Sequence, residues 1–278
     1  MRRHLLLKNR KLLAGPYLFW SVSFIIIPLL MIFYYGLTDK EGTFTWSNIA
    51  MMASPENLKA LGLALLLSLV STLICLVLAY PLAMILSEKN MNQTSLIVLI
   101  FILPMWMNFL LRTLAWQTLL EKNGVINSIL AFFRLPQQSI INTPGAIVLG
   151  MVYNFLPFMV LQINTALCKM DPSLLEASAD LGANRVQTFR RVTLPLSLPG
   201  VINGITLVFL PAVSSFFIPK LLGGGQYFLI GNMIENQFIT VGEWNFGSAI
   251  SMIMAVIMMV LMMVVRKIEI RNQGGKGV

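Results

Sequence analysis

Long apolar runs alternate with short polar segments along this chain. Each run is close to the roughly 20 residues that a helix needs to cross the hydrocarbon core of a bilayer. The pattern therefore predicts an all-α, polytopic membrane protein with six transmembrane helices, which places both termini on the same side. The runs lie near residues 16–37, 62–86, 95–117, 145–167, 200–220 and 247–265.

Prolines fall inside most of these runs. Proline has no N–H and its ring presses on the preceding turn, so it kinks a helix. Membrane bundles tolerate such kinks where neighbouring helices or water satisfy the freed carbonyl. A bundle with many kinks suits a moving pathway, although kinks are also common in membrane helices. The prolines are Pro28, Pro81, Pro104, Pro157 and Pro211.

The longest charged segment between two apolar runs separates the fourth run from the fifth. Asp171 and Pro172 suit the N-cap and first turn of a helix. Gly182 stands where a left-handed residue would end that helix. A second amphipathic stretch, Val186–Val192, follows and is expected to stop before Pro195. The pattern predicts two short helices joined at a glycine.

Lysine and arginine are distributed unequally between the two sides. The proposed outer segments hold only Lys40, Lys59, Lys122, Arg134 and Lys220. Apart from one arginine inside a span, the remaining basic residues lie in the proposed inner segments. Such asymmetry marks the cytoplasmic side. Both termini and the charged segment are therefore expected in the cytoplasm, and the net charge of +9 reflects topology rather than nucleic-acid binding.

Composition supports a membrane protein. The 278 residues are 57% hydrophobic and 11% charged, with a mean hydropathy of +0.78, whereas soluble domains carry about 25% charged residues. The two cysteines, Cys75 and Cys168, are expected to be buried apolar thiols that form no disulfide framework. His4 is the only histidine, which leaves no zinc cluster and no histidine-based catalytic triad.

The sequence also contains no P-loop motif for binding a nucleotide. No G-x-x-x-x-G-K-[ST] segment occurs, so the chain cannot bind ATP through a P-loop. Glu176 and Asp180 are four residues apart on one helix face, which is no catalytic pair. We therefore expect no enzyme activity, no metal and no cofactor in this chain, and any ATP that drives it must be bound by another subunit.

The charged segment resembles a known motif. It is similar to the E-A-A-x3-G-x9-I-x-L-P loop of binding-protein-dependent ABC importer permeases, with Ser178 in place of the second alanine and Val192 in place of isoleucine. The resemblance implies a type I importer permease whose cytoplasmic coupling helix docks on an ATPase. The alternative is an ordinary amphipathic loop on the membrane surface. The implied coupling residues are Glu176, Ala177, Asp180, Gly182, Leu194 and Pro195.

Three further segments narrow the resemblance. Residues 103–116, 180–200 and 223–238 look like the PotB-type permeases of spermidine/putrescine importers. This implies a bacterial inner-membrane complex with an ATPase pair that binds ATP and Mg, a second homologous permease of PotC type, and an extracytoplasmic polyamine-binding protein. The expected organisation is a single permease domain over 1–278, with a cytoplasmic segment 1–13, a coupling loop 168–199 and a disordered tail 268–278.

Polar and aromatic residues near the outer half of the spans are candidates for the substrate path. Serine and asparagine in spans also serve helix–helix hydrogen bonds, so both roles stay open. Arg112 is expected to extend to the interface. Glu235 and Glu243 are expected outside, where they could attract cations or contact the binding protein. The path candidates are Trp106, Asn108, Tyr153, Ser214, Phe216 and Phe217.

Two outer segments have structure of their own. Gly124–Leu135 has apolar residues at helical spacing and is expected to form an external amphipathic helix. Residues 221–238 combine a glycine run with an apolar stretch, which could re-enter the membrane or dock outside.

Other functions remain as alternatives. The same machine could carry another solute, such as iron, thiamine or an inorganic anion. A secondary transporter would need ionisable residues near the midplane and often shows inverted repeats, and neither is visible. A membrane enzyme is disfavoured because the spans hold no cluster of His, Asp or Glu.

Overall fold

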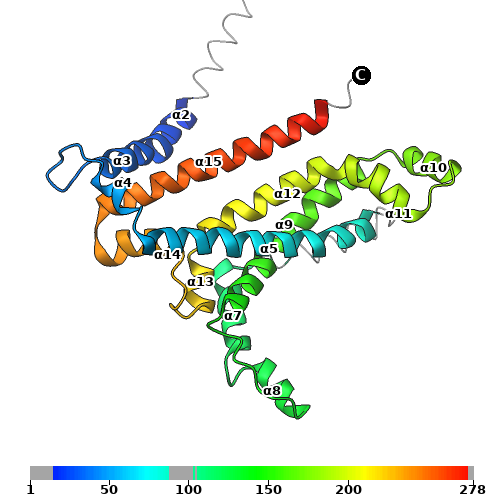
Figure 1. Cartoon of the computed structure of the whole chain (residues 1–278), viewed down its shortest axis with the longest axis horizontal. Coiled ribbons are helices and arrows are strands. Elements are labelled where there is room, and N and C mark those ends of the chain that lie inside the picture. Colours follow the sequence, from blue (N-terminus) through cyan, green and yellow to red (C-terminus); the bar gives the residue numbers. More distant parts are fainter. Residues whose placement is uncertain (1–14, 88–102, 104, 275–278) are drawn as a thin grey trace, which may run out of the picture. The chain divides into compact units, whose positions relative to one another are not determined.

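The computed structural model describes residues 15–87, 103 and 105–274, with side chains to residue 268 (Figure 1). The predicted N-terminal segment 1–13 lies outside the described residues. The chain divides into two compact units, residues 1–58 with 234–257, and residues 59–233 with 258–278. In the described part, the regular elements are helices, apart from one antiparallel bridge between Thr38 and Phe44.

The first unit contains the first predicted span and the outer loop that follows it. The span is helical over Gly15–Gly36, which confirms the run at 16–37. Its elements are α2 (Gly15–Ser21), η1 (Val22–Ile26), α3 (Ile27–Gly36), α4 (Ser47–Met51), η3 (Asn236–Val241) and the first part of α15 (Trp244–Gly274).

Proline explains the wide turn within this span. The N–H of Ile27 reaches back five residues to the Val22 carbonyl, which makes η1 a π-turn. The next residue, Pro28, has no N–H to give and its ring needs space on the preceding turn. The chain therefore widens one turn instead of breaking the helix.

Close backbone packing joins α3 to α15 in the first unit. A Cβ on Gly36 would lie 3.3 Å from the Ala249 nitrogen, so the glycine allows the two helices to meet. Beyond it, the side-chain amide of Asn245 donates to the carbonyl of Thr38 at 2.7 Å. Asn48 donates to the same carbonyl at 2.8 Å. The loop that follows α3 is thus fixed by two asparagines.

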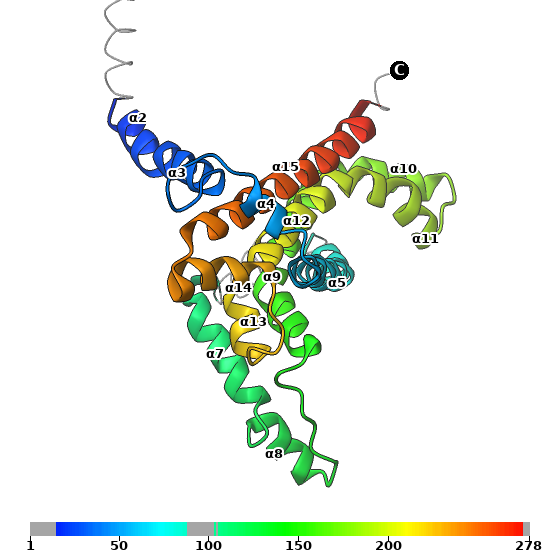
Figure 2. The ribbon, with the colours of Figure 1, turned by 60° about the vertical axis from the view of Figure 1, so that its left-hand side comes forward.

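The second unit holds the remaining helices, drawn in Figures 1 and 2. In both views α13 lies beside α7 and α9, as their contacts require. The elements are most of α5 (Pro55–Ser87), then α7 (Phe109–Leu120), α8 (Val125–Phe132), α9 (Pro144–Cys168), α10 (Pro172–Asp180), α11 (Arg185–Thr188), η2 (Phe189–Thr193), α12 (Leu194–Ser214), α13 (Phe217–Leu222) and α14 (Ile230–Glu235).

Glycines bring α9 and α12 together. A Cβ on Gly200 would lie 2.5 Å from the Ala166 Cβ and 2.7 Å from the Gln162 carbonyl oxygen. One turn further, a Cβ on Gly204 would lie 2.5 Å from the Met159 sulfur. Small residues at helix interfaces are the usual means of close packing in membranes. These two helices form the centre of the second unit.

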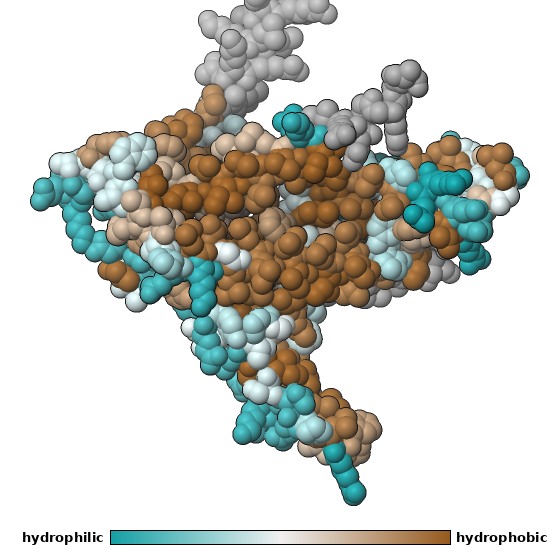
Figure 3. All heavy atoms as spheres, in the orientation of Figure 1, coloured by the Kyte–Doolittle hydropathy of each residue, from teal (hydrophilic) through white to brown (hydrophobic). Residues whose placement is uncertain are grey.

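The fully buried face of α5 is also built from small residues. Ala64, Cys75, Ala79 and Ala83 have no exposed surface. Cys75 is therefore buried as expected, whereas Cys168, at the end of α9, is exposed and that expectation was wrong. At this face the Ser71 hydroxyl contacts the Met151 sulfur at 3.5 Å. Figure 3 shows that apolar residues cover the outside of α5 and α12, whereas hydrophilic residues gather at the end that carries α10 and α11. This distribution fits a bundle whose sides face lipid.

Five helices of the described part are long and apolar enough to cross a membrane. The third predicted span, 95–117, lies partly outside the described residues, so the number six stays a prediction. Its described portion is α7, which begins only after Asn108, because that side chain caps the helix by accepting from the Leu110 N–H at 2.8 Å. The last span continues in α15 to Gly274, so any tail begins later than residue 268.

Two predictions on the fifth run were wrong. The helix does not stop before Pro195, because η2 widens the turn and the helix runs unbroken over Arg185–Ser214. It also does not reach residue 220. The backbone of Ser215 is extended, with φ −65° and ψ 132°, and α13 starts anew after it.

Arg112 does not extend to the interface as expected. Its side chain lies on the inner face of α7 and is only 7% exposed. Its Nε and Nη1 atoms have no hydrogen-bond partner in the part of the chain that the structure describes. From the sequence, Arg112 was expected near the outer end of the third span. In the structure it lies in the first turn of α7, on the buried face of that helix.

Candidate coupling loop and transport pathway

The predicted coupling loop begins with a capped helix. The Asp171 carboxylate accepts the Ser173 N–H at 3.0 Å, and Pro172 occupies the first helical turn of α10. Hydrogen bonds from the Ser173 backbone and hydroxyl lower the pKa of Asp171 below its ordinary value, although burial opposes them. The carboxylate therefore stays ionised at the N-terminus of α10, where negative charge is favoured. This cap was expected from the sequence.

Gly182 ends α10 in the predicted left-handed conformation, with φ 73°. The Ala183 N–H donates to the Ser178 carbonyl at 3.1 Å and the Gly182 N–H to the Ala179 carbonyl at 2.8 Å. This pair of bonds is the Schellman arrangement, which satisfies the last carbonyls of a helix. A Cβ on Gly182 would meet nothing within 4 Å, so only the backbone angle requires glycine here.

The second half of the loop has its own cap and is bonded to the first. Asn184 and Gln187 exchange hydrogen bonds of 2.9 Å between side chain and backbone, which is a capping box. The hydroxyls of Ser178 and Thr188 lie 3.0 Å apart and join α10 to α11. Ser178, the departure from the alanine of the family motif, is therefore the residue that links the two helices.

The tip of the loop presents an unpaired apolar surface. Leu181 is 88% exposed and Val186 is 65% exposed. Glu176, Ala177 and Asp180 are exposed beside them on α10. Contiguous exposed apolar surface marks interaction sites in other proteins, so Leu181 and Val186 are candidates for a contact with another chain.

The other two predicted coupling residues differ from this exposed group. Leu194 and Pro195 are half-buried and lie within the helix that continues into the membrane. The predicted coupling residues thus form two groups, one exposed on α10 and one half-buried at the start of α12.

Tyr80 connects that end of the loop to another span. Its hydroxyl lies 2.6 Å from the Ser197 hydroxyl, in a buried position. Its ring packs edge-on against the Phe189 ring, with centroids 5.3 Å apart. Sequence reasoning missed this pair, because no pattern relates residues so far apart in the chain.

A polar cavity of about 420 Å³ opens at the base of the loop, between the ends of α9 and α12. Lys169 and Asp171 contribute charge to its wall, and Gln162 and Asn203 contribute amides. Gly200, which packs closely against α9, also lines this cavity.

The predicted path residues fall into separate groups. Trp106 is 77% exposed, while Asn108 is occupied in capping α7. Tyr153 packs edge-on against Trp116, with centroids 5.2 Å apart, and is 38% exposed. Asn154, beside it on α9, is buried and donates to the Gly150 carbonyl at 2.9 Å.

Ser214, Phe216 and Phe217 lie together where α12 ends. The two phenylalanine rings stack with centroids 4.2 Å apart and a tilt of 33°. Ser214 is exposed and donates to the carbonyls of Leu210 and Pro211 at 3.2 and 3.3 Å. The sequence prediction named these residues but not the helix break that brings them together.

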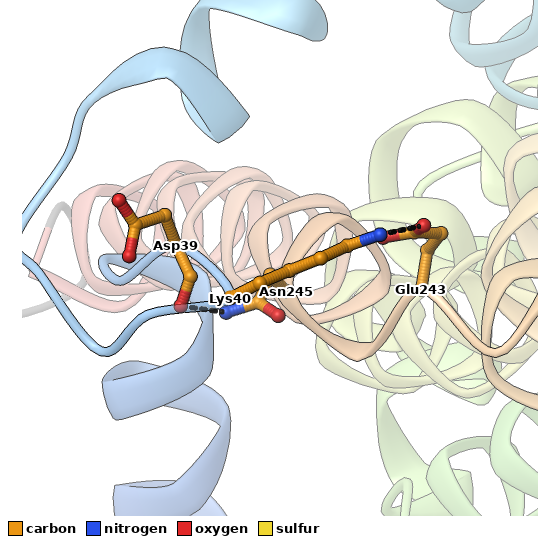
Figure 4. A network of polar contacts seen from close by, with 4 residues as sticks. All are labelled: Asp39, Lys40, Glu243 and Asn245. Carbon is orange, nitrogen blue, oxygen red and sulfur yellow. Dashed lines mark hydrogen bonds and ion pairs between the residues drawn. The ribbon is translucent and has the colours of Figure 1, made fainter.

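The two predicted outer acids are both engaged. Glu243 forms an ion pair with Lys40, and Asn245 bonds the carbonyl of Asp39 next to it (Figure 4). The Thr43 hydroxyl and N–H bond the Asp39 carboxylate and lower its pKa. Glu235 is half-buried at the end of α14 and also has an interaction partner. The charge of Glu243 is thus neutralised by a lysine within its own unit.

The two other segments predicted to lie outside contain helices. The predicted external amphipathic helix is α8, and its apolar residues Val125, Ile129 and Phe132 are all exposed. The glycine run of 221–238 leads into α14, whose Gly231 and Asn232 are buried. These two residues were not singled out from the sequence, and their only signal was a polar residue beside a glycine in an apolar stretch. No cluster suited to a metal ion occurs in the described ranges.

Comparison with known proteins gives consistent matches. Residues 12–271 match the family described as binding-protein-dependent transport system inner membrane component. The spermidine/putrescine transport system permease protein PotB of Haemophilus influenzae is 35% identical over 258 residues, which cover 90% of each chain. PotB of Escherichia coli is 36% identical over 246 residues, covering 86% of this chain and 90% of that one.

Solved structures agree on the fold. A bacterial ABC transporter involved in the import of the acidic polysaccharide alginate matches with a TM-score of 0.82 at 18% identity, over 97% of this chain and 96% of that one. The MetNI methionine ABC transporter in an inward-facing conformation matches with a TM-score of 0.58 at 20% identity, over 77% and 95% of the two chains.

Proposed function

Because the chain belongs to the binding-protein-dependent transport system inner membrane component family, we propose that it is the permease subunit of an ATP-driven ABC importer for spermidine and putrescine. The observation that carries the substrate class is the similarity to PotB proteins over nine-tenths of the chain. It is a multi-pass inner-membrane protein and not itself an enzyme.

The complete importer contains several chains. An ATPase pair binds ATP and Mg in the cytoplasm, and a second permease of PotC type completes the membrane pathway. An extracytoplasmic binding protein delivers the polyamine. ATP binding closes the ATPase pair, and hydrolysis reopens it, so that the pathway faces each side of the membrane in turn.

The loop around Gly182 is the contact with the ATPase in this proposal. Its exposed Leu181 supplies an apolar anchor, and Glu176 supplies charge for a basic residue of the ATPase. Asp180 lies solvated on the same helix. The rigid caps at Asp171 and Asn184 support the assignment, because a loop that transmits motion must not deform under load.

The pathway chemistry fits a flexible polycation. The apolar runs contain no Asp or Glu, so a cation inside them would meet aromatic faces, amides and carbonyls. Cation–π contact contributes roughly 0.5–2 kcal/mol, enough to guide an ammonium group without trapping it. Trp106, Asn108, Tyr153, Ser214, Phe216 and Phe217 are the proposed lining, and Glu235 and Glu243 the proposed outer contacts.

The orientation follows the distribution of basic residues. The termini and the coupling loop lie in the cytoplasm, and the loop that carries Lys40 and Glu243 lies outside. Arg190 and Arg191 then stand at the cytoplasmic surface, where anionic headgroups favour positive charge.

Reconstitution tests the function directly. The permease pair and the ATPase are reconstituted in liposomes so that the ATPase faces the lumen, which contains ATP. The binding protein is supplied, and the uptake of labelled spermidine into the liposomes is measured. ATP-dependent uptake that needs the binding protein is the expected result. If iron, thiamine or an inorganic anion is imported instead and spermidine and putrescine are not, the substrate assignment fails and the importer assignment stands.

A further inference from the structure

The break between α12 and α13 leaves backbone carbonyls without helical partners. α12 ends at Ser214, Ser215 is extended, and α13 begins at Phe217. The Ser215 carbonyl would normally accept from the N–H four residues later, but that residue is Pro219, which has none. In the described part of the chain, neither the Ser214 nor the Ser215 carbonyl accepts a backbone hydrogen bond across the break.

A glycine of α14 lies against these two carbonyls. A Cβ on Gly231 would be 2.8 Å from each of the Ser214 and Ser215 oxygens. Any other residue would have to push α14 away from the break. Among the described residues the Gly231 N–H makes no hydrogen bond to either carbonyl, so both can still accept hydrogen bonds from a ligand.

The neighbouring residue adds a third oxygen. The side-chain amide of Asn232 donates to the Phe216 carbonyl at 2.8 Å, which places the side chain at the break. Asn232 is 4% exposed, and its Oδ1 has no partner among the residues that the structure describes. Because Oδ1 and Nδ2 share one carbon, this oxygen lies beside the Phe216 carbonyl. A buried acceptor without a donor is rare and calls for a ligand or water.

Two aromatic residues follow Ser214 and Ser215 in the chain. The stacked rings of Phe216 and Phe217 come from the residues directly after the extended Ser215, and both are half-buried. Ring faces attract cations. The break therefore combines three acceptor oxygens and two rings, without a carboxylate.

We propose that this break binds one ammonium group of the transported polyamine, an inference that rests on the proposed function. A primary ammonium has three donors and no acceptor, which matches the oxygens of Ser214, Ser215 and Asn232. The absence of an acid from this set means that the cation is held by dipoles alone and can leave. A permanently bound water on the same oxygens is the competing occupant.

The test uses the complete importer in liposomes and two readouts, spermidine taken up and ATP hydrolysed. In the Asn232→Leu variant the Oδ1 acceptor is lost. Uptake per ATP is expected to fall about tenfold, the scale of one lost hydrogen bond to a charged group. Hydrolysis stimulated by the spermidine-loaded binding protein should be retained, because docking and coupling do not involve the break. Unchanged uptake per ATP would overturn the proposal.

Asn48→Leu is the matched control. Asn48 is also a buried asparagine that donates to a backbone carbonyl, that of Thr38, at 2.8 Å, but it belongs to the first unit. Its loss is expected to reduce the amount of assembled importer and to leave uptake per ATP unchanged. An equal fall in uptake per ATP in both variants would assign Asn232 a structural role and reject the binding site.

A second arm does not depend on the folding of Asn232→Leu. The Ser215→Cys variant is made in a chain in which Cys75 and Cys168 have been replaced. The rate at which its thiol reacts with a cationic reagent, ethylammonium methanethiosulfonate, is compared with the rate for an anionic one, ethylsulfonate methanethiosulfonate. The cationic reagent is expected to react about tenfold faster, and spermidine should slow it. Equal rates without protection by spermidine would refute a cation site. Failure of the wild type to import spermidine would instead reject the proposed function. The ratio of the two reaction rates at Ser215→Cys can be measured even in that case, because it does not require transport.

Discussion

The hydroxyl oxygens of Tyr80 and Ser197 lie 2.6 Å apart in the buried contact between α5 and the first turns of α12. Ser197 also donates to the Leu194 carbonyl at 3.1 Å, within its own helix. The Tyr80 ring covers Phe189 on the membrane side of the coupling loop. A span that is distant in sequence therefore holds the point where the loop enters the membrane.

A double-mutant cycle measures this contact. Tyr80→Phe and Ser197→Ala each remove one hydroxyl, and each should lower the free energy of unfolding by about 1 kcal/mol, the usual value of a buried hydrogen bond. The double variant should lose less than the sum, because the second change removes a hydroxyl whose partner has gone. Thermal unfolding of the purified complex gives the three values. Strict additivity would mean that the two hydroxyls do not interact.

Gly182→Val tests the left-handed turn. Because a Cβ meets nothing there, the cost is that of a positive φ, about 1–2 kcal/mol. We expect uptake per ATP to fall while the spans stay folded. Gly62→Val is the matched control, since Gly62 also has open space around it but no positive φ. If both variants transport normally at normal expression, the turn is not needed for coupling.

Leu181→Ser tests the exposed tip. The side chain is 88% exposed, so its replacement should leave the stability of the permease unchanged and reduce co-purification of the ATPase severalfold. Ile239→Ser serves as the control, because Ile239 is 75% exposed but lies in η3. Glu176→Lys should weaken the same contact by charge. Undiminished co-purification with both loop variants would place the ATPase elsewhere.

Orientation is tested by single cysteines at Ser173 and Gln137, both exposed, after Cys75 and Cys168 are replaced. An impermeant thiol reagent added to whole cells should label position 137 and spare position 173. Permeabilised cells should show labelling at both positions. Labelling of both from outside contradicts the cytoplasmic placement of the loop.

Much of the membrane architecture could be predicted from the sequence because single residues determine it locally. The apolar run at 16–37 became one span, and Asp171 and Gly182 bounded α10 as their chemistry requires. These signals depend on neighbours within one turn. They need no knowledge of the tertiary fold.

Predictions of helix ends failed at prolines, because a proline can either end a helix or widen one of its turns. Pro195 was expected to stop a helix, but a π-turn absorbs it. Pro219 was not considered, although it leaves the Ser215 carbonyl free at the break between α12 and α13. Whether a proline widens a turn or ends a helix depends on the space that neighbouring helices leave, which the sequence does not contain.

Side-chain partners at long range were also beyond sequence reasoning. Arg112 was expected at the interface and is buried. Glu243 was expected to attract cations or contact the binding protein, and the sequence did not indicate its ion pair with Lys40. Both outcomes depend on which helices pack together. Tyr80 and Ser197 make the same point, since neither residue is unusual within its own span.

The π-turn before Pro195 has a mechanical consequence. It keeps Arg185–Ser214 in one rod of 30 residues, about 45 Å long at 1.5 Å per residue. Gly200, at which a Cβ would lie 2.5 Å from the Ala166 Cβ of α9, stands near its middle. A rod pressed at its centre is a lever with a pivot and two nearly equal arms. In the proposed importer, a push on α11 by the ATPase would therefore swing Ser214 the opposite way by a similar distance and couple opposite movements at the two ends of the helix.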